Sequence, residues 1–223
     1  MALFGYEAQL LQGILVTLEV AVASAVFGVL LGILGAAAKL SRHAWISRPV
    51  GAVTDLLRGI PEFLILLICY FGLTNLLTGW FGTRVDISPF AGGVFALSIV
   101  FGAYASEAFR GAFLGVSAGQ LEAAHAFGMR PLQVFFRIHL PQAWRLALPS
   151  LNNQWQNVIK DSSLVSIVGL EDLMRKAQIG AQVTKHPFNF YIAAALVYLL
   201  LLTLSNPLFN LLERRAGRGL RRR

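Results

Sequence analysis

The sequence predicts an all-α integral membrane protein in which residues 1–223 form a single domain with five transmembrane helices. Composition is the first reason: 56% of the residues are hydrophobic, 13% are charged, and the mean hydropathy is +0.63, values unlike those of soluble domains. The second reason is a set of long apolar runs at 14–38, 56–77, 90–113 and 188–212. Each is long enough to cross a bilayer as a helix, and none alternates as a membrane strand does.

The basic residues predict the orientation of these helices, because cytoplasmic segments of membrane proteins are enriched in Lys and Arg. Lys39 and Arg42 follow the first run, which places that end in the cytoplasm and the N-terminus outside. Arg84 lies in the next loop, which is weakly charged and fits the periplasm. Six arginines follow the last run and require a cytoplasmic C-terminus: Arg214, Arg215, Arg218, Arg221, Arg222 and Arg223.

The loop at 117–141 and the C-terminus are both expected in the cytoplasm, but only one clear apolar run, 188–212, lies between them. A chain that leaves the cytoplasm and returns must cross the membrane twice, so a fifth crossing is required between 141 and 187. The only stretch long enough is 142–168, and it is polar. It carries Asn152, Asn153, Gln154, Gln156, Asn157, Lys160 and Asp161. Such a helix must face the interior of the bundle or a water-filled cavity. The segment 169–185 is then a periplasmic excursion, with a short amphipathic helix through Leu173.

The loop at 117–141 is expected to form a cytoplasmic helix-turn-helix elbow. Ser117 and Gln120 fit a capping box at the start of its first helix. Gly128 can end that helix in the left-handed conformation, and Pro131 suits the first turn of the next helix. The alternative is an ordinary linker between two helices.

Small residues in the first run predict a close contact with another helix. Gly28, Gly32 and Gly35 recur at intervals of three or four residues, so they share one helix face. Packing within the chain and packing against another subunit are both compatible with this pattern.

Four residues are candidates for structural or gating roles. Pro61 is expected to bend or start the second span, and Arg58 is either an anchor at the membrane interface or part of a gate. Glu107 and Arg110 are three residues apart on one helix and are expected to form an ion pair.

The polar span is the best candidate for a substrate pathway. Gln154, Asn157 and Asp161 project from nearly the same helix face. The anionic Asp161 and the two amides could hold an ammonium or guanidinium group. Lys160 points elsewhere and could pair with a substrate carboxylate or with Asp161 of the partner helix. A buried hydrogen-bond network at a subunit interface is the alternative.

The sequence shows no catalytic or metal-binding pattern. The four histidines lack metal-ligand spacing, and Cys69 is the only cysteine. There is no G-x-x-x-x-G-K-[ST] segment to hold phosphates, so we expect no cofactor and no metal on this chain. Basic and aromatic residues do not interleave as in RNA-binding proteins, so no nucleic acid partner is expected.

Several segments resemble the permease subunits of bacterial ABC importers. Glu122-Ala123-Ala124, three residues, Gly128, nine residues, and then Ile138, Leu140 and Pro141 reproduce the cytoplasmic EAA loop of that family. Arg58-Gly59-Ile60-Pro61 resembles the R-G-x-P motif of polar amino-acid permeases. Further segments at 15–19, 110–113 and 163–172 resemble the HisQ type, which serves histidine, lysine, arginine and ornithine.

The resemblance implies a type I ABC importer permease fold in the bacterial inner membrane. Docking to the ATPase would fall to the EAA-loop residues Glu122, Ala123, Ala124, Gly128, Ile138, Leu140 and Pro141. The segment Lys160-Asp161-Ser162-Ser163 would lie near the pathway. Gln154 departs from the Glu of several basic amino-acid permeases, so a sister subunit could contribute more of the binding site.

The resemblance also implies the partners of the chain. These are an ATPase dimer that binds ATP and Mg, a second permease subunit of the HisM type or a second copy of this chain, a periplasmic binding protein, lipid and an amino-acid substrate. Basic L-amino acids are the expected substrates, with glutamine, glutamate or an opine as the alternative. A proton-coupled carrier using Glu19, Glu107 and Asp161 is a further alternative, which the EAA pattern disfavours.

Overall fold

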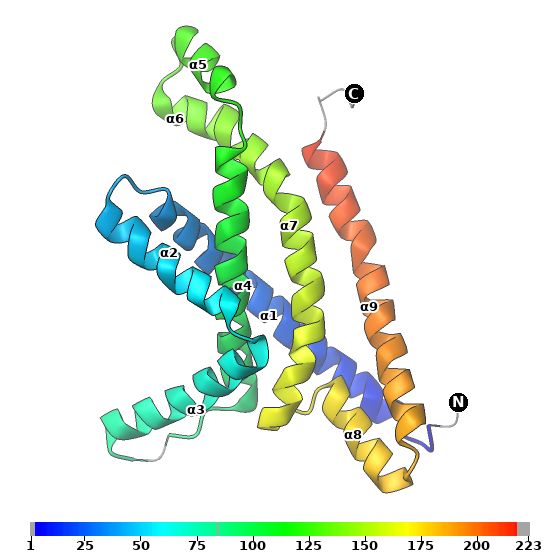
Figure 1. Cartoon of the computed structure of the whole chain (residues 1–223). Helices are drawn as coiled ribbons and strands as arrows, with labels where there is room; N and C mark the ends of the chain where they lie inside the picture. Colours follow the sequence, from blue (N-terminus) through cyan, green and yellow to red (C-terminus); the bar gives the residue numbers. More distant parts are fainter. Residues whose placement is uncertain (1–2, 84, 218–223) are drawn as a thin grey trace.

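The computed structural model describes residues 3–83 and 85–217, and the regular elements within them are helical. Arg84, Arg218 and Arg221–Arg223, which entered the predicted topology, lie outside the described residues. In chain order the elements are α1 (Glu7–Lys39), α2 (Ala44–Gly59), α3 (Glu62–Phe81), α4 (Pro89–Leu114), α5 (Ala118–Ala126), α6 (Pro131–Val134), the π-helical turn η1 (Phe135–His139), α7 (Leu140–Asp161), the 3-10 helix η2 (Ser162–Val168), α8 (Leu173–Thr184) and α9 (Pro187–Ala216) (Figure 1).

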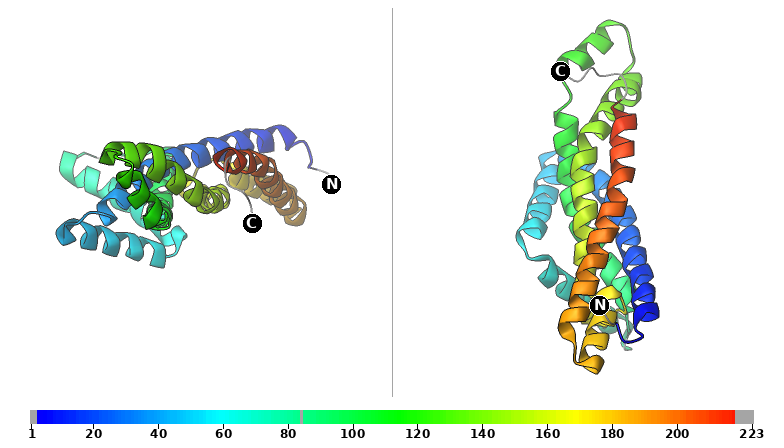
Figure 2. Two further views of the ribbon diagram at one scale, coloured as in Figure 1. Left: turned by 90° about the horizontal axis from the view of Figure 1, so that it is seen from above. Right: turned by 90° about the vertical axis from the view of Figure 1, so that its right-hand side faces the viewer.

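The helices form an elongated bundle whose two ends differ. Helices α4, α7 and α9 run side by side along the bundle, and α1 crosses them obliquely (Figures 1 and 2). The elbow formed by α5 and α6 lies at the same end as the C-terminal end of α9. The start of α1 and the helix α8 lie at the opposite end. This arrangement agrees with an outside N-terminus and a cytoplasmic C-terminus.

Four of the described helices are long and apolar enough to cross a membrane, namely α1, α3, α4 and α9. The fifth predicted crossing corresponds to α7, which is long enough but too polar to meet the same criterion. Helix α7 lies between α4 and α9, and this position removes much of its surface from lipid, as its composition requires.

The contact between α1 and α4 confirms that the glycines of the first run pack within the chain. A Cβ atom at Gly28 would lie 2.6 Å from the ring of Phe101, and one at Gly32 would lie 2.6 Å from Ala105 Cβ. Only glycine therefore allows the two helices to approach this closely.

The segment 56–77 is not one helix, because the second span starts at Pro61, one of the two outcomes expected for that proline, and not at residue 56. Helix α2 ends at Gly59, and α3 begins at Glu62, with Ile60 extended (φ −95°, ψ 138°) between them. The reason is Pro61, whose ring forces the preceding residue out of the helical conformation. The two halves diverge on either side of this break (Figure 1), which we call the α2–α3 break.

The predicted helix 142–168 is α-helical only as far as Asp161. Helix α7 starts at Leu140 and gives way at Ser162 to the 3-10 helix η2. Ser162, Ser163 and Ser166 each donate their hydroxyl to the carbonyl three residues earlier, at 2.7 Å. These local hydrogen bonds favour the tighter 3-10 turn.

Helix α8 confirms the expected short helix after the polar span. Its first residue, Leu173, is fully buried, and Asp172 caps it by accepting a hydrogen bond from Arg175 N–H at 2.9 Å. The Thr17 hydroxyl of α1 accepts from Leu173 N–H at 3.2 Å. Burial raises the pKa of Asp172 to about 6, because the charged form loses its hydration.

We expect Gly28→Ala to destabilise the protein by about 1–3 kcal/mol, because the added methyl group overlaps Phe101. Gly72→Ala is the matched control, since a Cβ atom there meets nothing within 4 Å. The measurement is the thermal unfolding midpoint of each variant in detergent. Equal midpoints for the two variants would contradict the close α1–α4 contact.

We expect Asp172→Asn to stabilise the protein in a pH-dependent way. The folded state holds the Asp172 proton up to pH about 6, whereas the unfolded chain releases it near the ordinary value of 3.8. The contribution of Asp172 to stability therefore falls between these pH values and stays low above them. Asparagine keeps the cap without the charge, so its advantage should grow as the pH rises from about 4 to about 6.

The control for this prediction is Glu171→Gln, which removes an exposed carboxylate next to Asp172. Lys176 lowers the pKa of Glu171 through a direct hydrogen bond, so this variant should show no advantage at high pH. Unfolding midpoints of both variants between pH 4 and 8 test the idea. An advantage of Asp172→Asn that does not vary with pH would refute it.

Candidate functional site: a cytoplasmic elbow and a polar cleft

The cytoplasmic elbow is built from α5, α6 and η1. Helix α5 ends at Ala126, and Gly128 follows in the left-handed region with φ +79°. The chain turns there, as the sequence predicts, because glycine adopts this conformation without steric cost. Pro131 opens α6, and η1 leads directly into α7. The elbow is therefore continuous with the polar helix.

One local prediction for the elbow is wrong. The Ser117 side chain makes no capping hydrogen bond to α5. A side-chain cap forms instead at α6, where Gln133 Oε1 accepts from Arg130 N–H at 2.9 Å. Local pattern alone did not distinguish these two helix starts.

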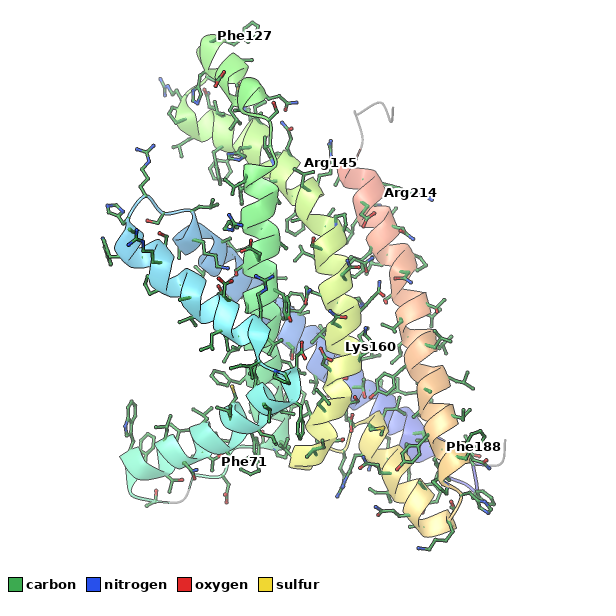
Figure 3. The ribbon with its side chains drawn as sticks, viewed as in Figure 1. Phe71, Phe127, Arg145, Lys160, Phe188 and Arg214 are labelled. Atoms are coloured by element: carbon green, nitrogen blue, oxygen red, sulfur yellow. The ribbon has the colours of Figure 1, made fainter. Side chains whose placement is uncertain are left out.

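The predicted docking residues of the elbow divide into exposed and inward-facing groups. Glu122, Ala123, Gly128 and Pro141 are exposed. Ala124 is buried, and Ile138 and Leu140 are half-buried. The same elbow carries exposed apolar side chains that the sequence analysis missed: Phe127, Leu132 and Phe136 are 89%, 72% and 61% exposed. Phe127 lies at the tip of the elbow (Figure 3).

The predicted substrate face of α7 is brought together by the structure. Gln154, Asn157 and Asp161 line one small cavity of about 10 Å³ between α7 and α4, which has room for about one water molecule, and Asn157 is an exposed residue. Lys160 is exposed and does not line this cavity; Figure 3 labels it on α7. Ser162 and Ser163 donate to backbone carbonyls and do not line it either.

A larger cleft of about 470 Å³ adjoins this cavity. Arg58 of α2, Tyr104 and Glu107 of α4, and Gln154 of α7 are among its lining residues. Gln154 lines both the cleft and the small cavity, so the two share one wall. We call the two together the polar cleft.

The α2–α3 break lies against the polar cleft. Tyr104 donates its hydroxyl to the carbonyl of Arg58 at 3.4 Å, which satisfies a backbone group at the end of α2. Glu62, in the first turn of α3, interacts electrostatically with both Tyr104 and Asp161. The sequence analysis did not single out Tyr104 or Glu62, because the sequence pattern does not show which helices pack against the chain around Pro61.

An ion cluster forms the other end of the cleft. The predicted pair is present: Arg110 Nε donates to Glu107 Oε1 at 3.1 Å. Lys39 of α1 also donates to Glu107, at 3.2 Å, and its side chain is only 5% exposed. The partner Lys39 lies 68 residues away in sequence, so spacing along one helix could not reveal it. The cluster joins α1 to α4 just before the elbow.

Comparison with known proteins identifies the family. Residues 28–218 match the family described as "Binding-protein-dependent transport system inner membrane component". The permease protein HisQ of the histidine/lysine/arginine/ornithine transport system of Salmonella typhimurium is 41% identical over 224 residues, which cover 99% of this chain and 98% of the relative. The nopaline permease protein NocQ of Agrobacterium fabrum is 46% identical over 224 residues, covering 97% and 94%.

A solved structure has the same fold. The crystal structure of an amino acid ABC transporter with histidines contains a chain that matches with a TM-score of 0.83 and 33% identity, covering 94% of this chain and 95% of that one. Sequence and structure thus agree over almost the whole length. The chain therefore belongs to the family of inner-membrane components of binding-protein-dependent transport systems, as a permease of the type I ABC importer fold.

Proposed function

We propose that this chain is the permease subunit of an importer for basic L-amino acids, namely arginine, ornithine, lysine and histidine. The observation that carries the proposal is the polar cleft, in which Asp161, with Glu62 nearby, places negative charge beside the amides of Gln154 and Asn157. Carboxylates in a partly enclosed site favour a cationic ligand. The relative HisQ belongs to a transport system whose name lists histidine, lysine, arginine and ornithine, and the 41% identity to HisQ supports this assignment.

The energy for transport comes from a separate ATPase dimer, which binds ATP and Mg and docks on the elbow. The exposed Glu122 and Ala123 lie on α5, and the exposed rings of Phe127 and Phe136 flank them. Apolar groups exposed together mark protein-protein interfaces in general. A closing motion of the ATPase would move the elbow, and through η1 it would move α7.

Two further partners complete the proposed machine. A second permease subunit, either of the HisM type or a copy of this chain, pairs with this one to enclose the pathway. A periplasmic binding protein delivers the amino acid. The buried face of α4 and the polar face of α7 supply one half of the pathway wall.

An opine is the alternative substrate, and the 46% identity to the nopaline permease NocQ is the observation that favours it. Uptake into proteoliposomes that contain the full set of subunits separates the two. Labelled arginine uptake that requires ATP and is competed by ornithine, lysine and histidine supports the proposal. Competition by nopaline or octopine but not by lysine would transfer the assignment to the opine, and uptake without ATP would refute the importer mechanism.

Phe127→Ser should weaken binding of the permease to its ATPase by roughly 10- to 100-fold, as expected for an exposed aromatic anchor at an interface. The fold should survive, because the ring is 89% exposed. Phe188→Ser is the control, since Phe188 is 72% exposed at the opposite end of the bundle (Figure 3). Affinity is measured by titration of the purified ATPase. Equal losses in both variants would exclude specific docking at the elbow.

Asp161→Asn should raise the KM for arginine uptake by about tenfold or more, because a charge-assisted contact contributes about 1.5–3 kcal/mol. The neighbouring Lys160→Gln, which changes an exposed side chain outside the cavity, should leave the KM unchanged. Initial uptake rates over a range of arginine concentrations give both values. A wild-type KM in a folded Asp161→Asn protein would remove Asp161 from the site.

A further inference from the structure

We propose that Arg58 recognises the α-carboxylate of the substrate, so that the polar cleft binds both charged ends of a basic amino acid. In this arrangement the carboxylate lies at Arg58 and the cationic side chain at Asp161. The inference rests on the proposed function and adds a specificity-determining residue to the same site.

The guanidinium of Arg58 has hydrogen-bonding capacity that the protein does not use. Its Nε atom is buried and has no hydrogen-bond partner among the described residues. Its Nη1 atom lies 3.5 Å from Asp55 Oδ1, but the Asp55 side chain is 71% exposed, and such exposed pairs contribute little. A buried donor without an acceptor is costly, and a ligand carboxylate at this position would satisfy it.

The guanidinium is also held in place before any ligand arrives. Its Cζ atom lies 5.5 Å from the centre of the Tyr104 ring, a distance at which a cation is attracted to the ring face. The hydroxyl of the same tyrosine donates to the Arg58 carbonyl. Tyr104 thus fixes both the backbone and the side chain of Arg58. A planar guanidinium in a fixed position is suited to bidentate binding of a carboxylate.

Gln154 is the lining residue that the cleft with Arg58 and the small cavity with Asp161 have in common. Arg58 and Gln154 line the cleft of about 470 Å³, and Gln154 and Asp161 line the adjoining small cavity. The larger volume is within the range of small-molecule sites. The cavity beside Asp161 has room for only about one water molecule. In this proposal the amino acid therefore occupies the larger cleft, with its carboxylate at Arg58 and its cationic end reaching past Gln154 toward Asp161.

Lys160, the candidate for the carboxylate contact from sequence alone, is placed differently. It lines neither the cleft nor the small cavity. In this proposal Arg58 makes the carboxylate contact that the sequence suggested for Lys160. Arg58 reaches the cleft because α2 ends at the α2–α3 break, beside Tyr104.

The test is equilibrium binding to the purified permease–ATPase complex without the periplasmic binding protein, so that only the membrane site is measured. Labelled arginine is displaced by arginine and by argininamide, which lacks the carboxylate. In Arg58→Gln, affinity for arginine should fall by roughly 10- to 100-fold, while affinity for argininamide changes by less than about threefold. Arg58→Lys keeps the charge without the planar fork and should show an intermediate loss.

Arg48→Gln is the matched control. Arg48 lies on the same helix and lines a neighbouring pocket that also includes residues of the ion cluster, but it does not line the cleft that contains Gln154, so both affinities should stay at the wild-type level. Equal losses for arginine and argininamide in Arg58→Gln, or no loss for either, would overturn the carboxylate contact. If the wild-type complex bound no basic amino acid, the proposed function would fail as well. If the wild-type complex binds arginine and Arg58→Gln prefers arginine over argininamide to the same extent as the wild type, only the role of Arg58 is refuted.

Discussion

The structure depends on the requirement that the polar groups of α7 be kept away from lipid. A bilayer offers them no hydrogen-bond partners. Helix α4 packs beside this face, where Gln154 and Asp161 are half-buried and Asn157 is exposed. On the other side, Gln156 Nε2 donates to Asn206 of α9 at 3.3 Å. The close contact at Gly28 and Gly32 packs α1 against α4. The packing of the bundle and the presence of a polar cleft therefore have the same cause.

At the cytoplasmic end, hydrogen bonds connect the elbow and α7 to the neighbouring helices α4 and α9. Arg145 Nε donates to the carbonyl of Ala216 at 2.6 Å, which joins the start of α7 to the end of α9; Figure 3 labels Arg145 and Arg214 at these neighbouring ends. His139 Nε2 contacts the carbonyl of Phe113 at 3.0 Å, which joins η1 to α4. With Lys39 and Glu107 between α1 and α4, these contacts connect the elbow to the helices of the cleft, which is the connection that the proposed mechanism uses.

Most of the fold could be predicted because hydropathy and charge act over whole segments. The apolar spans, the polar fifth helix, the turn at Gly128 and the Glu107–Arg110 pair all depend on local pattern. The start of a helix at Pro61 was expected from the proline itself, but the apolar run 56–77 concealed that the residues before it belong to a separate helix, α2, which ends at Gly59. The roles of Lys39 and Tyr104 could not be predicted, since their partners are distant in sequence and meet only when the helices pack.

The most direct test of the account is the water accessibility of α7 in the assembled transporter. Cys69 is first replaced by serine, and single cysteines are then introduced at Gln154, Asn157, Asp161 and the fully buried Ile159. The account predicts that a water-soluble maleimide labels the first three positions, that arginine protects them, and that Ile159 stays unlabelled. Labelling that is absent from all four positions, or equal at all four and insensitive to arginine, would contradict a polar cleft along α7.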